Sequence, residues 1–411
     1  MNLHHRSFHL LLVVGPPFIV VTILINAYII AFKLFPVGRR TLNVTSATGL
    51  VVSGFEMKPY DVAVTAATNA DVSTKYVSLC WERLHGYHRT GNQLFMLATM
   101  LYVAHLTGRK VAMPKRGWSL DDVFNLTAVR DDGGGDDIIV RTDELDQPDA
   151  PPGCRSPRRC RRVDSSSFYG ADEKFASRAA LEELTRTEDH LLLCGLYQTY
   201  AYATAVENQL RRLLVFRAEI RAAAEKFLLD CRPTNWNGDR NGAYYRVGVH
   251  IRRGDFLVAE EIVHGLTVVD GVYLRHAFDY FRRRYARLQF IVATQDWRWT
   301  RANLPPTLPR SADEVVDDDD GNSSRSSSSS TTPTPPTVVV TYSRNHCTGV
   351  DLAILAACDA VVVSTGTFGW WAAWLAAGPT IYYADWPRNR SRFARELNRT
   401  GYFPPHWIPM L

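Results

Sequence analysis

The sequence predicts an α/β protein with two domains behind an apolar N-terminal segment, and three observations lead to this prediction. In the second half of the chain, short runs rich in Val and Ile alternate with stretches of helical length, the pattern of a parallel sheet with helices on its faces. The 411 residues, 46% of them hydrophobic, are enough for two domains of about 150 residues and further segments. Finally, the 26 residues between Arg6 and Lys33 include no Asp, Glu, Lys or Arg.

The apolar segment at residues 10–32 is long enough to cross a bilayer as one helix. It predicts a transmembrane signal anchor between a cytoplasmic tail at 1–9 and a stem at 33–74 that is rich in Thr, Ala and Val. A cleaved signal peptide is the alternative, but the apolar run is longer than a usual signal-peptide core, and no clear small-residue cleavage site closes it. The charges that flank the segment do not settle its orientation.

Glycosylation motifs give a second indication of topology. Five Asn-x-Ser/Thr motifs follow the apolar segment and none precedes it, which favours a lumenal body on a short cytoplasmic tail. The motifs lie at Asn43, Asn125, Asn322, Asn389 and Asn398.

Charge and cysteine content exclude several classes of protein. The formal net charge of +5 is slight and scattered, so it does not argue for nucleic-acid binding. The seven cysteines form no Cys-x-x-Cys motif, which removes the main support for a zinc ribbon or a thioredoxin-like protein. Because their number is odd, at least one thiol lies outside any intrachain disulfide.

The first domain is expected at residues 75–235. A strand at 76–81 is followed by a turn centred on Gly91, a helix with apolar residues from Leu94 to Ala104, and a short strand at 110–113. Residues 130–164 indicate a solvated insertion with one short strand at 138–141. The arginine cluster at 155–162 fits an exposed basic loop better than a nucleic-acid patch. One long helix is expected over 200–230, before a polar linker at 235–242.

The second domain is expected at residues 236–411. Strands are expected at 245–251, 288–293, 337–341, 360–363 and 380–383, and helices at 272–285, 350–357 and 368–376. Residues 313–337 combine an acidic run, a Ser run and three prolines, which predicts a disordered surface loop. The acidic run at 317–320 contains the Asp-x-Asp pattern of metal-dependent sugar transferases, but without flanking strands it is interpreted as solvated charge.

The loop after the expected strand at 245–251 is the first candidate site. It carries His250, Arg252, Arg253 and Asp255. In an open α/β sheet, ligands bind beyond the carboxyl ends of the strands, which is where this loop emerges. Two guanidinium groups present planar forks of donors that match the oxygens of a diphosphate. The alternative is a surface arginine pair that forms a local salt bridge with Asp255.

A second candidate loop follows the buried strand at 360–363. A Ser/Thr/Gly turn in front of a helix presents backbone N–H groups to an anion, although Thr367 could also be an ordinary helix cap. The tryptophans that follow, Trp370, Trp371 and Trp374, fit core packing better than base stacking. The turn consists of Ser364, Thr365, Gly366, Thr367, Phe368 and Gly369.

Asp351 has two open interpretations. It lies three residues after Thr348, the spacing of a capping box, but its carboxylate could also accept from the N–H edge of a guanine. Other motif classes fail, because the glycines at 133–135 lack the Gly-Lys-Ser/Thr of a phosphate loop and no His-Glu-x-x-His or Gly-x-Ser-x-Gly occurs.

From about residue 76 to the C-terminus, the chain resembles the α-1,2-fucosyltransferases of glycosyltransferase family 11. The matching segments are, in order, 91–95, 249–256, 273–274 with 290–293, 351–355 and 366–376. Their order and spacing are more specific than any one of them. Two departures from the family pattern occur: His88, Arg89 and Thr90 precede Gly91 where the family usually has more glycine, and the insertion at 313–337 is long.

The resemblance implies a GT-B-like fold, in which two Rossmann-like domains face each other across a cleft, on a type II Golgi membrane anchor. It implies an inverting transfer of fucose from GDP-fucose to the 2-hydroxyl of a galactose-type acceptor, without a metal or another cofactor. By similarity, Asp351 would bind guanine, while Gly91, Asn92 and Gln93 would close the cleft from the first, acceptor-side domain. The donor diphosphate would contact Arg252, Arg253, Ser364, Thr365, Thr367 and Phe368.

Departure of GDP adds negative charge to the diphosphate, and a preorganised cation stabilises that charge in the transition state. We therefore expect Arg253→Ala to abolish transfer in a folded protein. Asp255 and His250 are candidates for a base, with Glu260 and Glu261 just beyond them, but a weak or absent base is the favoured hypothesis. A fucosyltransferase of another type, α-1,6 or protein O-linked, and a catalytically silent Golgi protein that binds nucleotide sugars are the alternatives.

Overall fold

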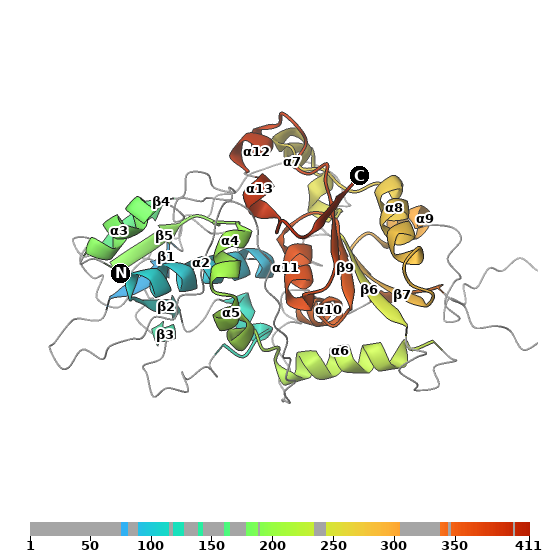
Figure 1. Ribbon diagram of the computed structural model, residues 1–411, viewed down its shortest axis with the longest axis horizontal. Coiled ribbons are helices and arrows are strands. Elements are labelled where there is room, and N and C mark those ends of the chain that lie inside the picture. The colour runs from blue at the N-terminus through green and yellow to red at the C-terminus, as the bar shows by residue number, and fades with distance from the viewer. Residues whose placement is uncertain are drawn as a thin grey trace, which may run out of the picture.

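The computed structural model describes residues 75–80, 89–114, 118–126, 139–142, 160–164, 178–187, 190–233, 244–304, 338–343, 347–397 and 399–411. The expected tail, transmembrane segment, stem and low-complexity loop, and the motifs at Asn43, Asn322 and Asn398, lie outside these residues. Within them, no helix combines the length and apolar character needed to cross a membrane. Figure 1 shows two lobes, each built around one sheet.

The first lobe contains five parallel strands in the order β3-β2-β1-β5-β4. Helix α2 (Thr90–Thr107) packs on this sheet with most of its side chains buried, and α3 (Arg178–Arg186) packs against α2. Gly108, with φ 66°, ends α2 in a left-handed cap. The expected strands near 110 and 139 are confirmed. The strands are β1 (Tyr76–Leu79), β2 (Lys110–Pro114), β3 (Ile139–Thr142), β4 (Cys160–Asp164) and β5 (His190–Cys194).

The second lobe contains six parallel strands in the order β11-β10-β9-β6-β7-β8. Counted from β6, this is the order 3-2-1-4-5-6 of a doubly wound nucleotide-binding sheet, with its switch point between β6 and β9. All five strands and three helices expected here are confirmed to within a few residues. The elements are β6 (Tyr245–Ile251), β7 (Leu288–Thr294), β8 (Val338–Ser343), β9 (Ala360–Val363), β10 (Thr380–Tyr383), β11 (Ile408–Met410), α8 (Gly271–Arg282), α9 (Trp297–Asn303), α10 (Thr348–Ala356) and α11 (Thr367–Ala376).

The two lobes share a hydrophobic core. The ring of Phe95, on α2, lies 4.6 Å from Trp370 and 5.2 Å from Trp371, both on α11. The tryptophans are fully buried, which confirms that they pack in the core. At the same junction a Cβ added to Gly91 would lie 2.6 Å from the backbone carbon of Thr367. A residue larger than glycine therefore does not fit where the first turns of α2 and α11 meet.

Three expectations about the first lobe were wrong. Gly91 lies inside the first turn of α2 rather than in a preceding turn. Cys160, Arg161 and Arg162 belong to β4 rather than to a loop, because β4 pairs in register with β5. The single helix expected over 200–230 is three helices. The first break is at Val206, which has non-helical backbone angles, and at the second break Phe216 forms an antiparallel bridge with Phe124, with ring centroids 4.9 Å apart. The three helices are α4 (Tyr200–Ala205), α5 (Glu207–Leu213) and α6 (Ala218–Asp230).

Helix α6 packs on the second lobe, although the expected boundary at 235 assigns it to the first. Ile220, Ala224 and Leu228 form a buried cluster with Ile354 of α10 and Ile291 of β7. In Figure 1, α6 runs beneath the second sheet. The chain therefore enters the second lobe before the polar linker.

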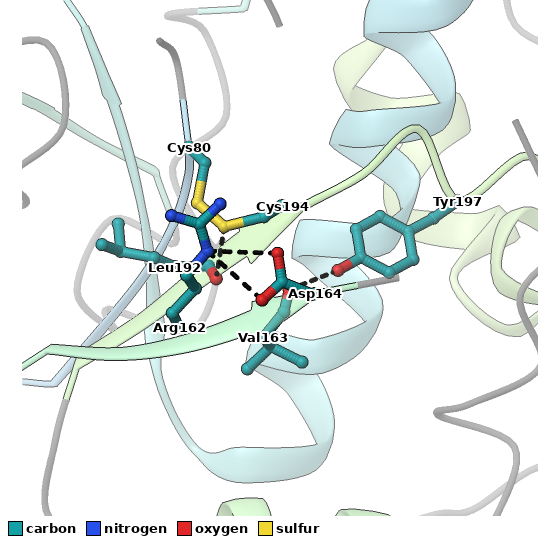
Figure 2. The surroundings of a disulfide bond; sticks show 7 residues. All are labelled: Cys80, Arg162, Val163, Asp164, Leu192, Cys194 and Tyr197. Carbon is teal, nitrogen blue, oxygen red and sulfur yellow. Dashed lines mark hydrogen bonds and ion pairs between the residues drawn. A yellow bond between two sulfur atoms is a disulfide. The ribbon is translucent and has the colours of Figure 1, made fainter. Parts of the chain in front are cut away.

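A disulfide joins Cys80 and Cys194 at the carboxyl ends of the neighbouring strands β1 and β5 (Figure 2). Beside it, Arg162 pairs with Asp164 on β4, and the Tyr197 hydroxyl donates to the Val163 carbonyl at 2.7 Å. These bonds hold the carboxyl ends of β1, β4 and β5 together. Cys231, Cys347 and Cys358 are free thiols.

Candidate active site

A cavity of about 950 Å³ lies where the two lobes meet, at the switch point of the second sheet. Its wall includes the loop after β6, the turn after β9, the first turn of α10 and the N-terminus of α2. Of the residues expected in the site, it contains Gly91, Asn92, His250, Arg252, Asp255, Asp351, Thr365, Thr367 and Phe368. Gln93, Arg253 and Ser364 lie behind its surface.

Asp255 lies between two guanidinium groups, one from each lobe. Its Oδ1 lies 2.6 Å from Arg252 Nη2, and its Oδ2 accepts from Arg89 Nη1 at 2.6 Å. The Arg252 side chain is 18% exposed and also donates to Gln295 Oε1 at 3.1 Å. Burial lowers the pKa of Arg252 while Asp255 opposes the shift, and a guanidinium keeps its charge well above neutral pH. Both arginines therefore present fixed positive charge to the cavity.

Arg253 points away from the cavity. Its Nε lies 3.0 Å from Asp296 Oδ2, its Nη1 donates to the Val269 carbonyl at 3.2 Å, and its guanidinium lies 3.8 Å from the centroid of the Trp299 ring. Only 12% of the side chain is exposed. These contacts tie the loop after β6 to α9, so in this conformation Arg253 supports the loop rather than the cavity wall.

His250 lies at the back of the cavity as a neutral ring. Burial, and secondarily the charge of Arg252, lower its pKa to about 3. Its Nδ1 has no hydrogen-bond partner, and a Cβ added to Gly369 would lie 2.5 Å from this nitrogen. A ring with so low a pKa is a weak base at neutral pH, so any contribution of His250 is that of a neutral group.

The turn after β9 is held by the loop after β6. The backbone N–H of Arg252 donates to Ser364 Oγ at 2.7 Å, and the N–H of Ser364 donates to the His250 carbonyl at 3.1 Å. Gly366, with φ 85°, precedes α11, whose first N–H groups have no partner within the helix and whose first residues, Thr367 and Phe368, line the cavity. The hydroxyl of Thr367 does not cap α11, as one interpretation expected, but donates to Asn92 Oδ1 at 2.9 Å.

Two helix N-termini from different lobes thus meet at the cavity. Asn92, in the first turn of α2, accepts from Thr367 of α11 and also from Gln198 Nε2 at 3.1 Å. Helices of 18 and 10 residues carry partial positive charge at these ends. Together with Arg252 and Arg89, they form an electropositive wall suited to a diphosphate.

A third part of the wall has acceptor character. Asp351 lies in the first turn of α10, where its Oδ1 accepts from the Ser343 hydroxyl at 2.6 Å. The capping-box interpretation was wrong, because the N-cap of α10 is Cys347 and Thr348 is the first helical residue. The carboxylate, beside Thr348 and Gln295, is a candidate for binding a base with an N–H edge.

Several wall residues were not expected from the sequence. Arg89 and Gln198 come from the first lobe and have no motif of their own. Gln295 follows β7, and the rule that ligands bind at carboxyl ends of strands could have identified it. The other side of the cavity is formed by Glu261, His264, Leu266, Trp386, Phe393 and Tyr402. The alternative base Glu261 therefore lies in the wall, whereas Glu260 does not.

A family model and the relatives found by sequence indicate the same family. The model of glycosyl transferase family 11 matches residues 182–325 and 335–410. These ranges include the arginine loop after β6 and the Ser/Thr turn after β9. Galactoside alpha-(1,2)-fucosyltransferase 1 of Homo sapiens is 28% identical over 322 residues, covering 78% of this chain and 72% of the relative. Galactoside alpha-(1,2)-fucosyltransferase 2 of Sus scrofa is 26% identical over 351 residues, or 84% of each chain.

Among solved structures, POFUT1 in complex with GDP-fucose is similar with a TM-score of 0.43 and 11% identity, over 77% of this chain and 99% of that one. The fucosyltransferase NodZ from Bradyrhizobium has a TM-score of 0.34 and 14% identity, over 73% and 92% of the two chains.

Proposed function

The chain belongs to glycosyl transferase family 11, and from this premise we propose that it transfers fucose from GDP-fucose to the 2-hydroxyl of a terminal galactose on a glycan. The relatives that cover most of the chain carry this activity in their names. The observation that carries the proposal is the electropositive wall, in which Arg252 meets the N-termini of α2 and α11. Such a wall binds a diphosphate and stabilises it as a leaving group.

In the proposed reaction, the acceptor oxygen bonds to C1 of fucose on the face opposite the diphosphate. The bond from C1 to the diphosphate oxygen breaks, its electron pair leaves with GDP, and the configuration at C1 inverts. Arg252 and Arg89 offset the charge that develops on GDP, without a metal or another cofactor. The guanine would lie at Asp351. Among the described residues, this is the only carboxylate in the part of the wall that β7 and α10 form.

Asp255 is placed to exchange partners during this reaction. In the structure its two oxygens pair with the guanidinium groups of Arg252 and Arg89. A bound diphosphate takes these donors and leaves the carboxylate near the acceptor side, where it can accept the proton of the hydroxyl. A base of this kind contributes less than the cationic wall when departure of the leaving group is advanced in the transition state.

We further propose a GT-B-like arrangement on a type II anchor in the Golgi membrane, with the body in the lumen. Two parallel sheets with a cavity between them support the arrangement. The disulfide between Cys80 and Cys194 and the exposed side chain of Asn389 support an oxidising, glycosylating compartment. Removal of N-glycans, with a shift in mass at Asn389, would test this location.

The activity is tested with the purified full chain, GDP-[¹⁴C]fucose and lactose. Radiolabelled trisaccharide with a 1,2 linkage by methylation analysis supports the proposal. Transfer only to N-linked core glycans or to peptides would instead indicate an α-1,6 or protein O-fucosyltransferase. Binding of GDP without transfer to any acceptor or to water would indicate a silent nucleotide-sugar-binding protein.

A further inference from the structure

An apolar patch lies beside the cavity, on the outside of the segment that forms part of its wall. We define this outer patch as Leu257, Val258, Ile262 and Val263, which lie on η6 (Gly254–Leu257) and on or next to α7 (Ala259–His264). Their exposed fractions are 43%, 47%, 40% and 76%. They are four of the nine exposed large hydrophobic residues in the described ranges, gathered within seven positions. Such a concentration marks a surface that is covered in use.

Helix α7 has two different sides. Glu261 and His264, three residues apart and so on one side of the helix, line the cavity. Ile262 and Val263 project to other sides and are exposed. Whatever covers the outer patch therefore lies next to the part of the cavity wall that Glu261 and His264 form.

Arginines border the outer patch. The segment 388–399 carries five exposed arginines against one glutamate, Glu396. It packs on α7, because Arg388 donates from its backbone to the Gly265 carbonyl at 2.8 Å and from its side chain to the Val263 carbonyl at 3.3 Å. Figure 1 shows α7 and α12 (Arg392–Glu396) together at the top of the view. We call residues 388–399 the arginine segment.

The close packing of these two segments depends on one glycine. Gly265 has φ 120°, and a Cβ added to it would lie 2.1 Å from Ser391 Oγ. Next to it, the rings of His264 and Phe393 meet edge to face at 5.6 Å. The outer patch and the arginine segment therefore form one continuous surface.

We propose that this surface rests on a lipid bilayer, so that the cavity opens toward acceptors carried by membrane lipids. The patch is aliphatic and stands on a helix exterior, whereas sugar and peptide sites are concave or rely on aromatic side chains. Aliphatic side chains flanked by arginines suit a membrane interface, where the apolar groups enter the acyl boundary and the guanidiniums bind lipid phosphates. Glu260 on α7, and Glu396, which pairs with Arg392, lower the net positive charge of this surface, so zwitterionic lipids are the appropriate test membrane.

This inference rests on the proposed transfer to galactose and on membrane anchoring, and its test separates them. The full chain is reconstituted into phosphatidylcholine vesicles and assayed with two acceptors that end in the same disaccharide, lactosylceramide in the bilayer and lactose in solution. For the double variant Ile262→Ser/Val263→Ser we expect a loss of about tenfold in kcat/KM on lactosylceramide, from the apolar area no longer buried, and no loss on lactose. Val263→Leu is expected to retain wild-type rates on both.

Val272→Ser is the matched control, because Val272 is 42% exposed on α8 and does not line the cavity. It is expected to leave both rates unchanged, and the thermal unfolding midpoints verify that all variants fold. Equal losses on both acceptors, or none on either, would overturn the inference. Selective loss on a galactose-terminated glycoprotein, with lactosylceramide unaffected, would assign the surface to a protein partner and overturn it as well.

A second measurement is independent of activity. A bimane label on Val263→Cys, with the wild-type background subtracted, should shift to shorter wavelength in phosphatidylcholine vesicles compared with the same label on Val272→Cys. Equal spectra at both positions would overturn the inference. If wild type transfers fucose to neither acceptor, the proposed function fails, while the label still decides whether the surface contacts lipid.

Discussion

Replacement of Arg252 by Ala should remove activity without unfolding the protein. Arg252 presents its guanidinium to the cavity with 18% of the side chain exposed. At about 4 Å and an effective dielectric constant of about 20, one charge pair is worth about 4 kcal/mol. Because only the charge that develops in the transition state accelerates the reaction, we expect kcat/KM to fall about 10²- to 10³-fold. Stability should fall by about 1 kcal/mol or less, because Asp255 keeps Arg89 as its partner.

Arg253→Ala should behave in the opposite way. It removes an ion pair with Asp296, a hydrogen bond to the Val269 carbonyl and stacking on Trp299. We expect about 2–3 kcal/mol of destabilisation, and the midpoint of thermal unfolding should fall by roughly 5–10 °C. Activity should fall only as far as the loop after β6 loosens.

The two variants are compared in a GDP-release assay with a melting curve for each. Arg284→Ala, at the end of α8 and outside the cavity wall, is the control for loss of a surface arginine. The sequence analysis instead expects Arg253 to stabilise the charge on the departing GDP. An inactive, fully stable Arg253→Ala beside an active Arg252→Ala would establish that assignment and contradict the one from the cavity.

Four further outcomes follow from the site. Asp255→Asn should retain at least about a tenth of wild-type kcat, since we expect a base to contribute less to the rate than the cationic wall. Complete inactivity with normal GDP binding by calorimetry would contradict a minor role for the base. Asp351→Asn should weaken GDP binding about tenfold and IDP, which lacks the 2-amino group, by less; equal losses would remove Asp351 from guanine recognition. Gly91→Ala should lower both kcat/KM and the unfolding midpoint, because its Cβ would lie 2.6 Å from the Thr367 backbone, whereas Ala98→Gly, elsewhere in α2, should affect the midpoint alone. Because the pKa of His250 is lowered to about 3, the unfolded state binds more protons than the folded state between about pH 6.5 and pH 3. Stability should therefore fall by up to about 1.4 kcal/mol per pH unit as the pH decreases through this window. Urea titrations in which His250→Gln shows the same slope would contradict a buried neutral ring.

The second lobe was predicted well because its signals are local. Runs such as 360–363, four buried residues of Ala and Val, can hardly form anything but an interior strand. The loops that follow β6 and β9 could be placed together from the rule that carboxyl ends of parallel strands share one edge. Strand order, by contrast, depends on contacts distant in sequence.

The misplaced features have physical reasons of the same kind. Arg252 and Arg253 are equivalent in the sequence, and only the contacts with Asp296 and Trp299 distinguish them. Arg89 has no motif, because its role arises from an ion pair with a residue 166 positions away. Helix α6 has an ordinary amphipathic pattern, which predicts a helix but not the sheet on which it packs.

The aromatic junction between the lobes also limits how the enzyme can release its product. A hinge rotation that widened the cleft would separate Phe95 from Trp370 and Trp371 and expose parts of three large rings to water. At about 1.5–3 kcal/mol for each large side chain exposed, such an opening would cost roughly 5–9 kcal/mol. Motion of short segments at the rim is the less costly route for product release, so we expect the rate of turnover to depend on those segments more than on lobes swinging apart.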